Sequence, residues 1–461
     1  MKAVLDLLQV GLWACTLLSP TNALPSGPLP RSDNDNHWIT AWTAMPQLTE
    51  PANLPSGIFN ATPKFLDTTI RQTLKLDLPT GCQTSCNFRL RFSNAFGTTP
   101  LNISSVTVAR PFNNSAGTSS IIEGTFQPIS FDRGSDAGVS IPSGSLAVSD
   151  PFLFDFTGIT TYASNGSTEA GSILTVSMYL SGGQLGEAIT SHPGSRTNSY
   201  LSLGDQVSAL NVTGSEVQSL AHWYFISAVE AWASIPASTF VVVGDSITDG
   251  RGSDTNLNDR WPDFLFTRLR SSPATSEISV ANQAAGGNRI LADGLGPSAL
   301  SRIDRDVLAQ SGVGYAMIFE GVNDIGTAAA DPGAQSEVYD DLIAAYRQMI
   351  TRIHAQGIPV FGATITPFGS LNSTLQPYSD PAGYREQTRS RVNHWIRNSG
   401  EFDAVVDFDA IVRDAQNATM LASSYDSGDQ LHPNVNGYRA MAEGFPIEVF
   451  EQWKGGINTM V

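Results

Sequence analysis

The chain has 461 residues, of which 41% are hydrophobic and 15% are charged, a composition typical of a soluble globular protein and a length that favours two domains. Its formal net charge is -17, which argues against nucleic acid or an anionic membrane surface as a partner, because both attract clustered Lys and Arg. We therefore expect no nucleic acid and no integral membrane association, and the oligomeric state stays open.

The N-terminus is predicted to be a secretory signal peptide covering residues 1–23. Lys2 precedes a mostly apolar stretch from Leu7 to Leu18, and residues 21–23 offer a cleavage site of small residues. A membrane anchor is the alternative, but the apolar run is too short to cross a bilayer. We expect a secreted, extracellular protein.

Two further features are typical of a secreted chain. Asn-x-Ser/Thr sequons are predicted glycosylation sites, some of which we expect to be unused because such triplets also arise by chance. They begin at Asn60, Asn102, Asn113, Asn165, Asn211, Asn372 and Asn417. Cys82 and Cys86 are the cysteines left after removal of the signal peptide, and an even pair in an oxidising compartment predicts a disulfide. Half of a metal site is the alternative, but no other Cys or His lies nearby in the sequence.

Residues 37–235 are predicted to form a β-rich domain. Polar and apolar residues alternate in several short runs, and clusters of Gly, Pro, Asn and Ser separate them without a long helical period. The clearest runs are 69–76, 87–92, 105–109 and 173–180. This pattern favours an antiparallel sandwich or jelly roll. Cys82 and Cys86 are then expected at the tip of a hairpin, after the turn at 78–81.

Residues 238–455 show a different rhythm, in which strand-like and helix-like segments alternate. The predicted strands are 240–243, 279–281, 316–319, 360–365 and 404–408. In the predicted helix 337–354 apolar residues line one face, and Gly357 and Pro359 follow its end. Such alternation implies a parallel sheet covered by helices on both faces.

Chemically suggestive residues follow the predicted strands of this second half. Ser246 follows the first strand within Gly-Asp-Ser, Gly286–Gly287 follow the second, and Asn323 follows the third. Asp429 and His432 lie three residues apart in a loop before the last helical segment. In an open parallel sheet, ligands bind at the carboxyl ends of the strands, so we expect these groups to meet at one edge.

The serine, histidine and aspartate of this set predict acyl transfer. A serine hydroxyl needs a base to take its proton and a third group to orient that base. Ser246, His432 and Asp429 are of the right types for these roles. The structural alternatives are that Ser246 only caps a helix, that Asp429 and His432 form a surface turn, and that Asn323 forms an Asx turn. The chain has no Gly-x-Ser-x-Gly, which excludes the nucleophile elbow of α/β-hydrolases.

The chain resembles the SGNH hydrolases, also called GDSL esterases and lipases, in four separated sequence blocks. These blocks contain Ser246, Gly286–Gly287, Asn323 and the pair Asp429 and His432, in this order over residues 239–450. The resemblance implies a flavodoxin-like catalytic domain in which Ser246 is the nucleophile, His432 the base and Asp429 its orienting group. It further implies an oxyanion hole formed by the backbone N–H groups of Ser246 and Gly287 and the side-chain amide of Asn323.

The family's first block has Leu where this chain has Ile247, an apolar exchange that should not affect catalysis. The β-rich half, with its segment 89–97, looks like the accessory domain of a secreted two-domain subgroup of these enzymes. His192 lies in a predicted loop of this half that could reach the mouth of the site, although we interpret it as a structural or surface histidine.

The sequence thus predicts a secreted serine esterase that needs no metal or cofactor. The acidic composition and the lack of a long apolar helix that would serve as a lid favour short acyl groups, such as acetyl, on carbohydrates or other polar substrates. An extracellular lipase or phospholipase is the close alternative. A catalytically inert carbohydrate-binding protein is the alternative from another class.

Overall fold

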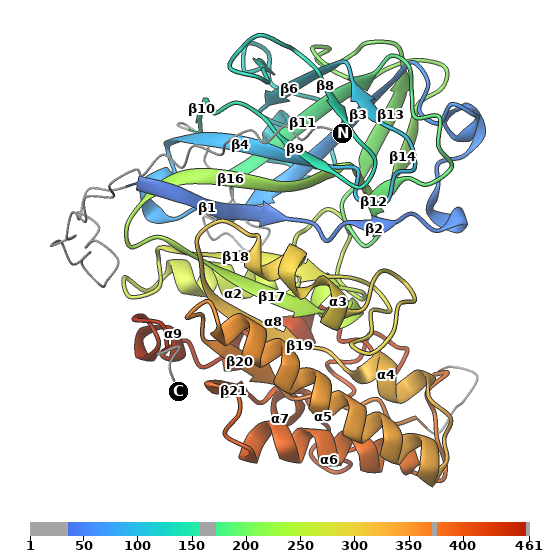
Figure 1. Cartoon of the computed structure of the whole chain (residues 1–461), viewed down its shortest axis with the longest axis vertical. Helices are drawn as coiled ribbons and strands as arrows, with labels where there is room; N and C mark the ends of the chain where they lie inside the picture. The colour runs from blue at the N-terminus through green and yellow to red at the C-terminus, as the bar shows by residue number, and fades with distance from the viewer. Residues whose placement is uncertain (1–35, 157–171, 371–375, 458–461) are drawn as a thin grey trace, which may run out of the picture. The chain divides into compact units, whose positions relative to one another are not determined.

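The computed structural model describes residues 36–156, 172–370 and 376–457 (Figure 1). The predicted signal peptide lies outside the described residues, as do the sequons at Asn165 and Asn372. No helix within the three described ranges is both long enough and apolar enough to cross a membrane.

The β-rich half contains two large antiparallel sheets (Figure 1). The five-stranded sheet has the order β1 (Asn36–Thr43), β16 (Ile226–Ser234), β4 (Ser85–Ser93) and β10 (Phe152–Asp155), with β9 (Leu146–Val148) also paired to β4. The six-stranded sheet has the order β14 (Gln218–Leu220), β13 (Ser199–Leu203), β3 (Thr68–Leu76), β11 (Ser172–Leu180), β6 (Ser105–Ala109) and β7 (Gln127–Ile129). Smaller sheets join β15 (Trp223–Tyr224), β12 (Thr190–His192) and β2 (Gln47–Leu48), and β5 (Leu101–Ile103) with β8 (Val139–Ile141). The predicted antiparallel architecture is confirmed.

Alternation along the strands explains how the two large sheets share one core. In β4, Phe88, Leu90 and Phe92 are buried and belong to the same apolar cluster as Ile70 and Leu74 of β3. Because successive side chains of a strand point to opposite faces, this pattern places one face of each sheet against the other. The sandwich is therefore held by apolar burial between the sheets.

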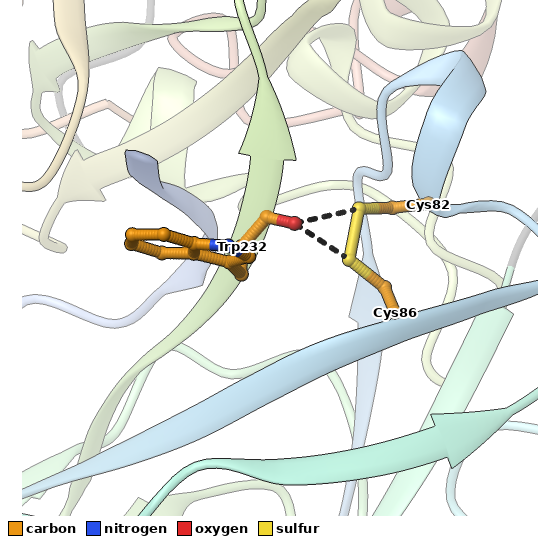
Figure 2. The surroundings of a disulfide bond; sticks show 3 residues. All are labelled: Cys82, Cys86 and Trp232. Carbon is orange, nitrogen blue, oxygen red and sulfur yellow. Dashed lines mark hydrogen bonds between the residues drawn. A yellow bond between two sulfur atoms is a disulfide. The ribbon is translucent and has the colours of Figure 1, made fainter. Parts of the chain in front are cut away.

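The expected hairpin at Cys82 and Cys86 is wrong, because β3 and β4 belong to different sheets. Both strands bury their apolar faces in the shared core, so the segment between them crosses from one sheet to the other. The disulfide joins Cys82 of this crossing to Cys86 at the start of β4 (Figure 2). The carbonyl oxygen of Trp232 lies 3.3 Å from Cys86 Sγ and 3.8 Å from Cys82 Sγ, so the disulfide packs against β16 (Figure 2).

The second half is built on a five-stranded parallel sheet. Its order is β18 (Ile278–Ala284), β17 (Ser238–Gly244), β19 (Val313–Phe319), β20 (Val360–Ala363) and β21 (Ala404–Val406). This order, 2-1-3-4-5 in sequence, is that of flavodoxin-like folds, so the predicted class is confirmed. Thr239 to Gly244 of β17 are all buried, as expected when helices cover both faces of a sheet.

The helices of this half form two groups. α2 (Trp261–Arg270) contacts α8 (Val435–Gly444), whereas α5 (Pro332–His354) contacts α3 (Ala299–Ile303) and α6 (Tyr384–Asn398). The other α-helices of the described residues are short and are α1 (Ser246–Asp249), α4 (Val322–Thr327), α7 (Phe408–Val412) and α9 (Val449–Gln452).

Among the predicted boundaries that differ from the structure, two have clear local reasons. α5 begins five residues earlier than Glu337, because Asp331 accepts hydrogen bonds from the N–H groups of Gly333 and Ala334 and proline occupies the first position of the helix. The strand expected at 404–408 ends at Val406 instead, because the Asp407 side chain caps α7.

Buried polar contacts join the two halves at β1. The Thr40 backbone N–H donates to Thr239 Oγ1 at 3.0 Å, and its carbonyl accepts from Ser279 Oγ at 2.7 Å. Thr40 Oγ1 in turn accepts from the Ser311 N–H at 3.1 Å. Thr40 of the β-rich half therefore bonds to three segments of the α/β half.

Candidate active site

The end of β17 and the start of α1 position Ser246. The Asp245 side chain accepts a hydrogen bond from the N–H of Ile247 at 2.9 Å and so caps α1. A Cβ at Gly244 would lie 2.6 Å from Thr248 Cβ, so glycine is required for the helix to turn this tightly over the strand end. Ser246 is the first residue of α1, and its backbone N–H therefore has no intrahelical acceptor.

The loop before α8 places a histidine and an aspartate against this serine. Ser246 Oγ lies 2.7 Å from His432 Nε2, and His432 Nδ1 lies 2.6 Å from Asp429 Oδ2. A carboxylate only accepts hydrogen bonds, so Nδ1 carries the proton and Nε2 offers its lone pair to the serine hydroxyl. Asp429 Oδ1 accepts from the backbone N–H groups of Leu431 and His432 at 3.0 and 2.8 Å, which fixes the carboxylate.

The environment keeps this histidine neutral and this aspartate charged. Burial lowers the pKa of His432, against the opposing effect of its bond to Asp429. Burial would raise the pKa of Asp429, but the hydrogen bond and charge of His432 together with backbone N–H donors hold it well below its usual range. The pair is therefore suited to accept a proton at Nε2 in neutral solution.

Gly287 adopts a backbone conformation that residues other than glycine rarely adopt. Its φ is +69°, and a Cβ there would lie 2.6 Å from Leu295 Cδ1. The preceding residue, Gly286, is bonded to α1, because its N–H donates to Asp249 Oδ2 at 3.1 Å. The sequence signal at this position, a Gly-Gly pair after a strand, thus corresponds to a constrained turn that is bonded to the serine helix.

The side-chain amide of Asn323 is held at both of its ends. Its Nδ2 donates to the Asn288 carbonyl at 2.8 Å, and its Oδ1 accepts from the Tyr378 hydroxyl at 2.9 Å. A carbonyl cannot donate, so the first contact identifies the nitrogen end of the amide. Asn288 directly follows Gly287, so these bonds join the third block to the second.

A buried charged cluster lies beneath these strand ends. Arg302 donates to the Asn288 side chain at 2.8 Å and to Glu320 at 3.2 Å, and both charged side chains are almost fully buried. Burial raises the pKa of Asp245 to about 7, and it raises that of Glu320 well above its usual value. Asp324 accepts from the N–H groups of Ile290 and Leu291 and so ties α4 to the segment after Gly287.

Tyr378 and Arg302 of this network carried no sequence signal. Tyr378 lies 55 positions from Asn323, and Arg302 contacts groups on three segments.

His192 of β12 is only 4% exposed, and its Nε2 lies 2.9 Å from Asp249 Oδ1 at the end of α1. Of the two interpretations of His192, the surface one is therefore wrong.

Residues 240–445 match the family model of GDSL-like lipases and acylhydrolases. This half of the chain is a GDSL/SGNH hydrolase domain. The GDSL domain begins inside β17 and ends after α8, so it includes each of the four sequence blocks. Its family acts on esters, and the domain is a GDSL-family esterase or acylhydrolase.

Solved structures resemble the GDSL domain at low identity. A catalytic mutant of an acetylxylan esterase from Geobacillus stearothermophilus is 18% identical, with 49% of this chain and 98% of that chain covered and a TM-score of 0.35. A GDSL-like lipase from Bacteroides thetaiotaomicron is 17% identical, with 47% and 88% covered and a TM-score of 0.33. No curated protein sequence matches the chain.

The described sequons lie at accessible positions. Asn102, Asn113, Asn211 and Asn417 are exposed and Asn60 is partly exposed. Asn60 and Asn211 also accept hydrogen bonds through their side-chain oxygens, from Lys64 and from Ser119. Glycosylation at these five positions is compatible with the fold and stays a prediction.

Proposed function

We propose that the chain is a secreted serine esterase that cleaves carboxylic esters through an acyl-enzyme. The observation that carries the proposal is the continuous set of contacts from Ser246 Oγ to His432 Nε2 and from His432 Nδ1 to Asp429 Oδ2, at 2.7 and 2.6 Å. The neutral state favoured for His432 and the charged state favoured for Asp429 support the same roles.

In the proposed reaction, Ser246 Oγ attacks the ester carbonyl carbon while its proton passes to His432 Nε2. The bond to the alcohol oxygen then breaks, and His432 returns the proton to that oxygen. Water next attacks the acyl carbon and gives a proton to His432. The acid leaves as Ser246 recovers its proton. Asp429 holds the imidazole in the required tautomer throughout.

The negative oxygen of each tetrahedral intermediate is proposed to accept hydrogen bonds from the backbone N–H groups of Ser246 and Gly287 and from the Asn323 amide. The positive φ of Gly287 and the double anchoring of Asn323 support preorganised donors. Such donors are each worth about 3 kcal/mol in the transition state, because they need no reorganisation as charge develops.

For the substrate we propose short acyl groups, such as acetyl, on carbohydrates or other polar alcohols. The acidic composition supports this choice, because a charged surface suits a polar ester better than a lipid. The mostly exposed Arg251 side chain, 3.8 Å from Asp429, places a further charged group beside the proposed site. One observation favours the alternative of a lipase or phospholipase. Leu295 is 51% exposed beside Gly287, where a longer acyl chain would find an apolar contact.

The test compares hydrolysis of p-nitrophenyl acetate, butyrate and palmitate by the wild type and by Ser246→Ala, followed by acetylated xylan and pectin. We expect acetate to be cleaved fastest and the variant to lose at least about 10⁴-fold in kcat. Fastest cleavage of palmitate would replace the proposed substrate class by the lipase. Unchanged turnover in Ser246→Ala would refute the catalytic assignment, whereas no turnover by the wild type on any of these esters would favour the inert carbohydrate-binding alternative.

Secretion is part of the proposal and has its own test. It is supported by the signal-like residues 1–23, the exposed sequons and the disulfide between Cys82 and Cys86. N-terminal sequencing of protein recovered from culture medium should begin after Ala23, and treatment with a glycosidase should lower its apparent mass. Retention of the protein inside the cells with residue 1 intact would contradict the proposal.

A further inference from the structure

A histidine of the β-rich half is bonded to the helix that carries the proposed nucleophile. His192 Nδ1 lies 3.1 Å from the Met45 carbonyl, and its Nε2 lies 2.9 Å from Asp249 Oδ1. The ring also stacks on Trp223, with the ring centroids 5.8 Å apart. The imidazole is thus fixed by β-rich residues on one side and reaches α1 with its other nitrogen.

The hydrogen-bond partners define where the protons lie in this contact. The Met45 carbonyl only accepts, so Nδ1 donates to it. A favourable Nε2–Oδ1 contact then requires a second proton between the imidazole and the carboxylate. The contact is therefore a charge-assisted hydrogen bond or its neutral equivalent, and both forms hold Asp249 Oδ1 firmly.

The two oxygens of Asp249 serve different halves of the site. Oδ1 contacts His192, and Oδ2 accepts from the Gly286 N–H at 3.1 Å. Gly286 precedes Gly287, the proposed oxyanion donor, and Asp249 ends the helix that Ser246 begins. The Asp249 carboxylate therefore joins α1, the Gly286–Gly287 turn and the β-rich half.

The fit around this carboxylate is close. A Cβ at Gly194 would lie 1.7 Å from Asp249 Oδ2, so the turn after β12 approaches the carboxylate as only glycine allows. Lys75, Asp77, Arg260 and Asp263 line a cavity of about 30 Å³ next to His192 and Asp249. Within that cavity Arg260 and Lys75 contact Asp263 at 2.8 and 3.5 Å, whereas His192 contacts Asp249.

We propose that His192 is a positioning residue for the esterase reaction, which acts through Asp249 to hold the Gly286–Gly287 turn beside Ser246. The proposal rests on the proposed function. It assigns the β-rich half a part in building the active site. Its consequence is that loss of the Nε2 contact lowers kcat and leaves KM nearly unchanged, because oxyanion donors act mainly in the transition state.

The test uses three substitutions of His192 in the full chain. Gln places a donor near the position of Nε2, Asn places one near the position of Nδ1, and Leu removes both. We expect His192→Gln to keep kcat for p-nitrophenyl acetate within about 5-fold of the wild type. We expect His192→Asn and His192→Leu to lose about 10- to 100-fold in kcat with KM changed less than about 2-fold. A merely structural role would make Asn as effective as Gln, and kcat would follow melting temperature in all three variants.

A matched histidine–aspartate pair provides the control. His354 Nε2 lies 2.8 Å from Asp403 Oδ2, between the end of α5 and the start of β21, at the amino end of the sheet and away from Ser246. The same three substitutions at His354 are expected to lower the melting temperature without changing kcat of the folded enzyme. Equal losses of kcat in the two series would overturn the proposal.

A second readout separates the proposal from the esterase assignment. Hydrogen exchange of the peptide that covers residues 282–290 reports the Gly286 N–H whether or not any ester is cleaved. We expect faster exchange there in His192→Leu and His192→Asn than in His192→Gln. If the wild type proves inactive on esters, the proposed function fails, and this exchange pattern still decides the link. Equal exchange in all variants would disprove it.

Discussion

At the scale of single residues, the proposed reaction depends on where the proton sits on His432. The base must be neutral to accept the Ser246 proton, so activity is present above the His432 pKa and lost as the pH falls through it. Burial lowers that pKa, and the bond to Asp429 opposes the shift. We expect the acidic limb of kcat/KM to lie below the range of an exposed histidine.

The Asp429→Asn variant tests both contributions at once. Its amide removes the charge that raises the His432 pKa, so the acidic limb should move to still lower pH. The plateau should fall by about 10⁴-fold, because the amide favours the wrong imidazole tautomer. Both effects are measured in one pH profile with p-nitrophenyl acetate. A limb that moves to higher pH in the variant would contradict this account.

The anchoring of Asn323 gives a second prediction at this scale. Tyr378→Phe removes the donor to Asn323 Oδ1 and should lower kcat by about 10-fold at constant KM, whereas Asn323→Ala should lower it by about 10² to 10³. Tyr315→Phe is the matched control, because its hydroxyl donates to the Phe450 carbonyl at 2.8 Å near the start of β19. The control should lose about 1 kcal/mol of stability and no turnover. If both tyrosine variants keep wild-type kcat, Tyr378 does not orient the amide.

The sequence predicted these residues unequally. Ser246, Asp429 and His432 carried a signal because the nucleophile directly follows a predicted strand and the other two lie three residues apart. Tyr378 and His192 reach their partners across 55 and 57 positions, through contacts that only the folded topology creates. Partners that lie far apart in the sequence leave no local pattern, which is why Tyr378 was missed and why His192 was noted as able to reach the mouth of the site but was interpreted as structural or surface.

At the scale of elements, the junction of β17 and α1 sets the direction of the serine. Gly244 has room for a hydrogen only, since a Cβ would lie 2.6 Å from both Thr248 Cβ and Thr248 Oγ1. Alanine there would push the first turn of α1 away from the strand. Ser246 Oγ would then leave its 2.7 Å contact with His432.

We therefore expect Gly244→Ala to lose at least about 100-fold in kcat/KM and about 1–3 kcal/mol in the free energy of unfolding. Gly455→Ala is the control, because no atom lies within 4 Å of its added Cβ. Ester hydrolysis and urea unfolding measure the two effects. Wild-type kinetics in a folded Gly244→Ala would mean that the close approach of helix and strand is not needed.

Element types were predicted well and element pairings less well. Long alternating runs such as β3 and β11 were expected within one residue of their observed bounds, and strand–helix alternation predicted the parallel orientation of the second sheet. The hairpin at Cys82 failed because alternation shows which face of a strand is buried and not which strand lies beside it. Both β3 and β4 fit the same core from opposite sheets.

At the scale of the whole molecule, each half contains buried polar groups whose hydrogen-bond partners lie in the other half. Thr40 bonds to Thr239, Ser279 and Ser311. Glu230 of β16 is fully buried and contacts Arg91 of its own half and the Ser311 hydroxyl of the other half. Separating the halves would leave these groups unpaired, at a cost of about 1–3 kcal/mol for each and more for the charged ones.

The chain should therefore unfold in one cooperative step despite its length. Differential scanning calorimetry is expected to give one peak whose calorimetric and van't Hoff enthalpies agree. Thr40→Val removes the acceptor of the Ser311 N–H and should lower the midpoint of that single peak, moving the signals of both halves together. Hydrogen exchange of core peptides from β4 and from β19 should accelerate in parallel. Two resolved transitions, or acceleration confined to one half, would show that the halves are independent and that the contacts at β1 do not couple them.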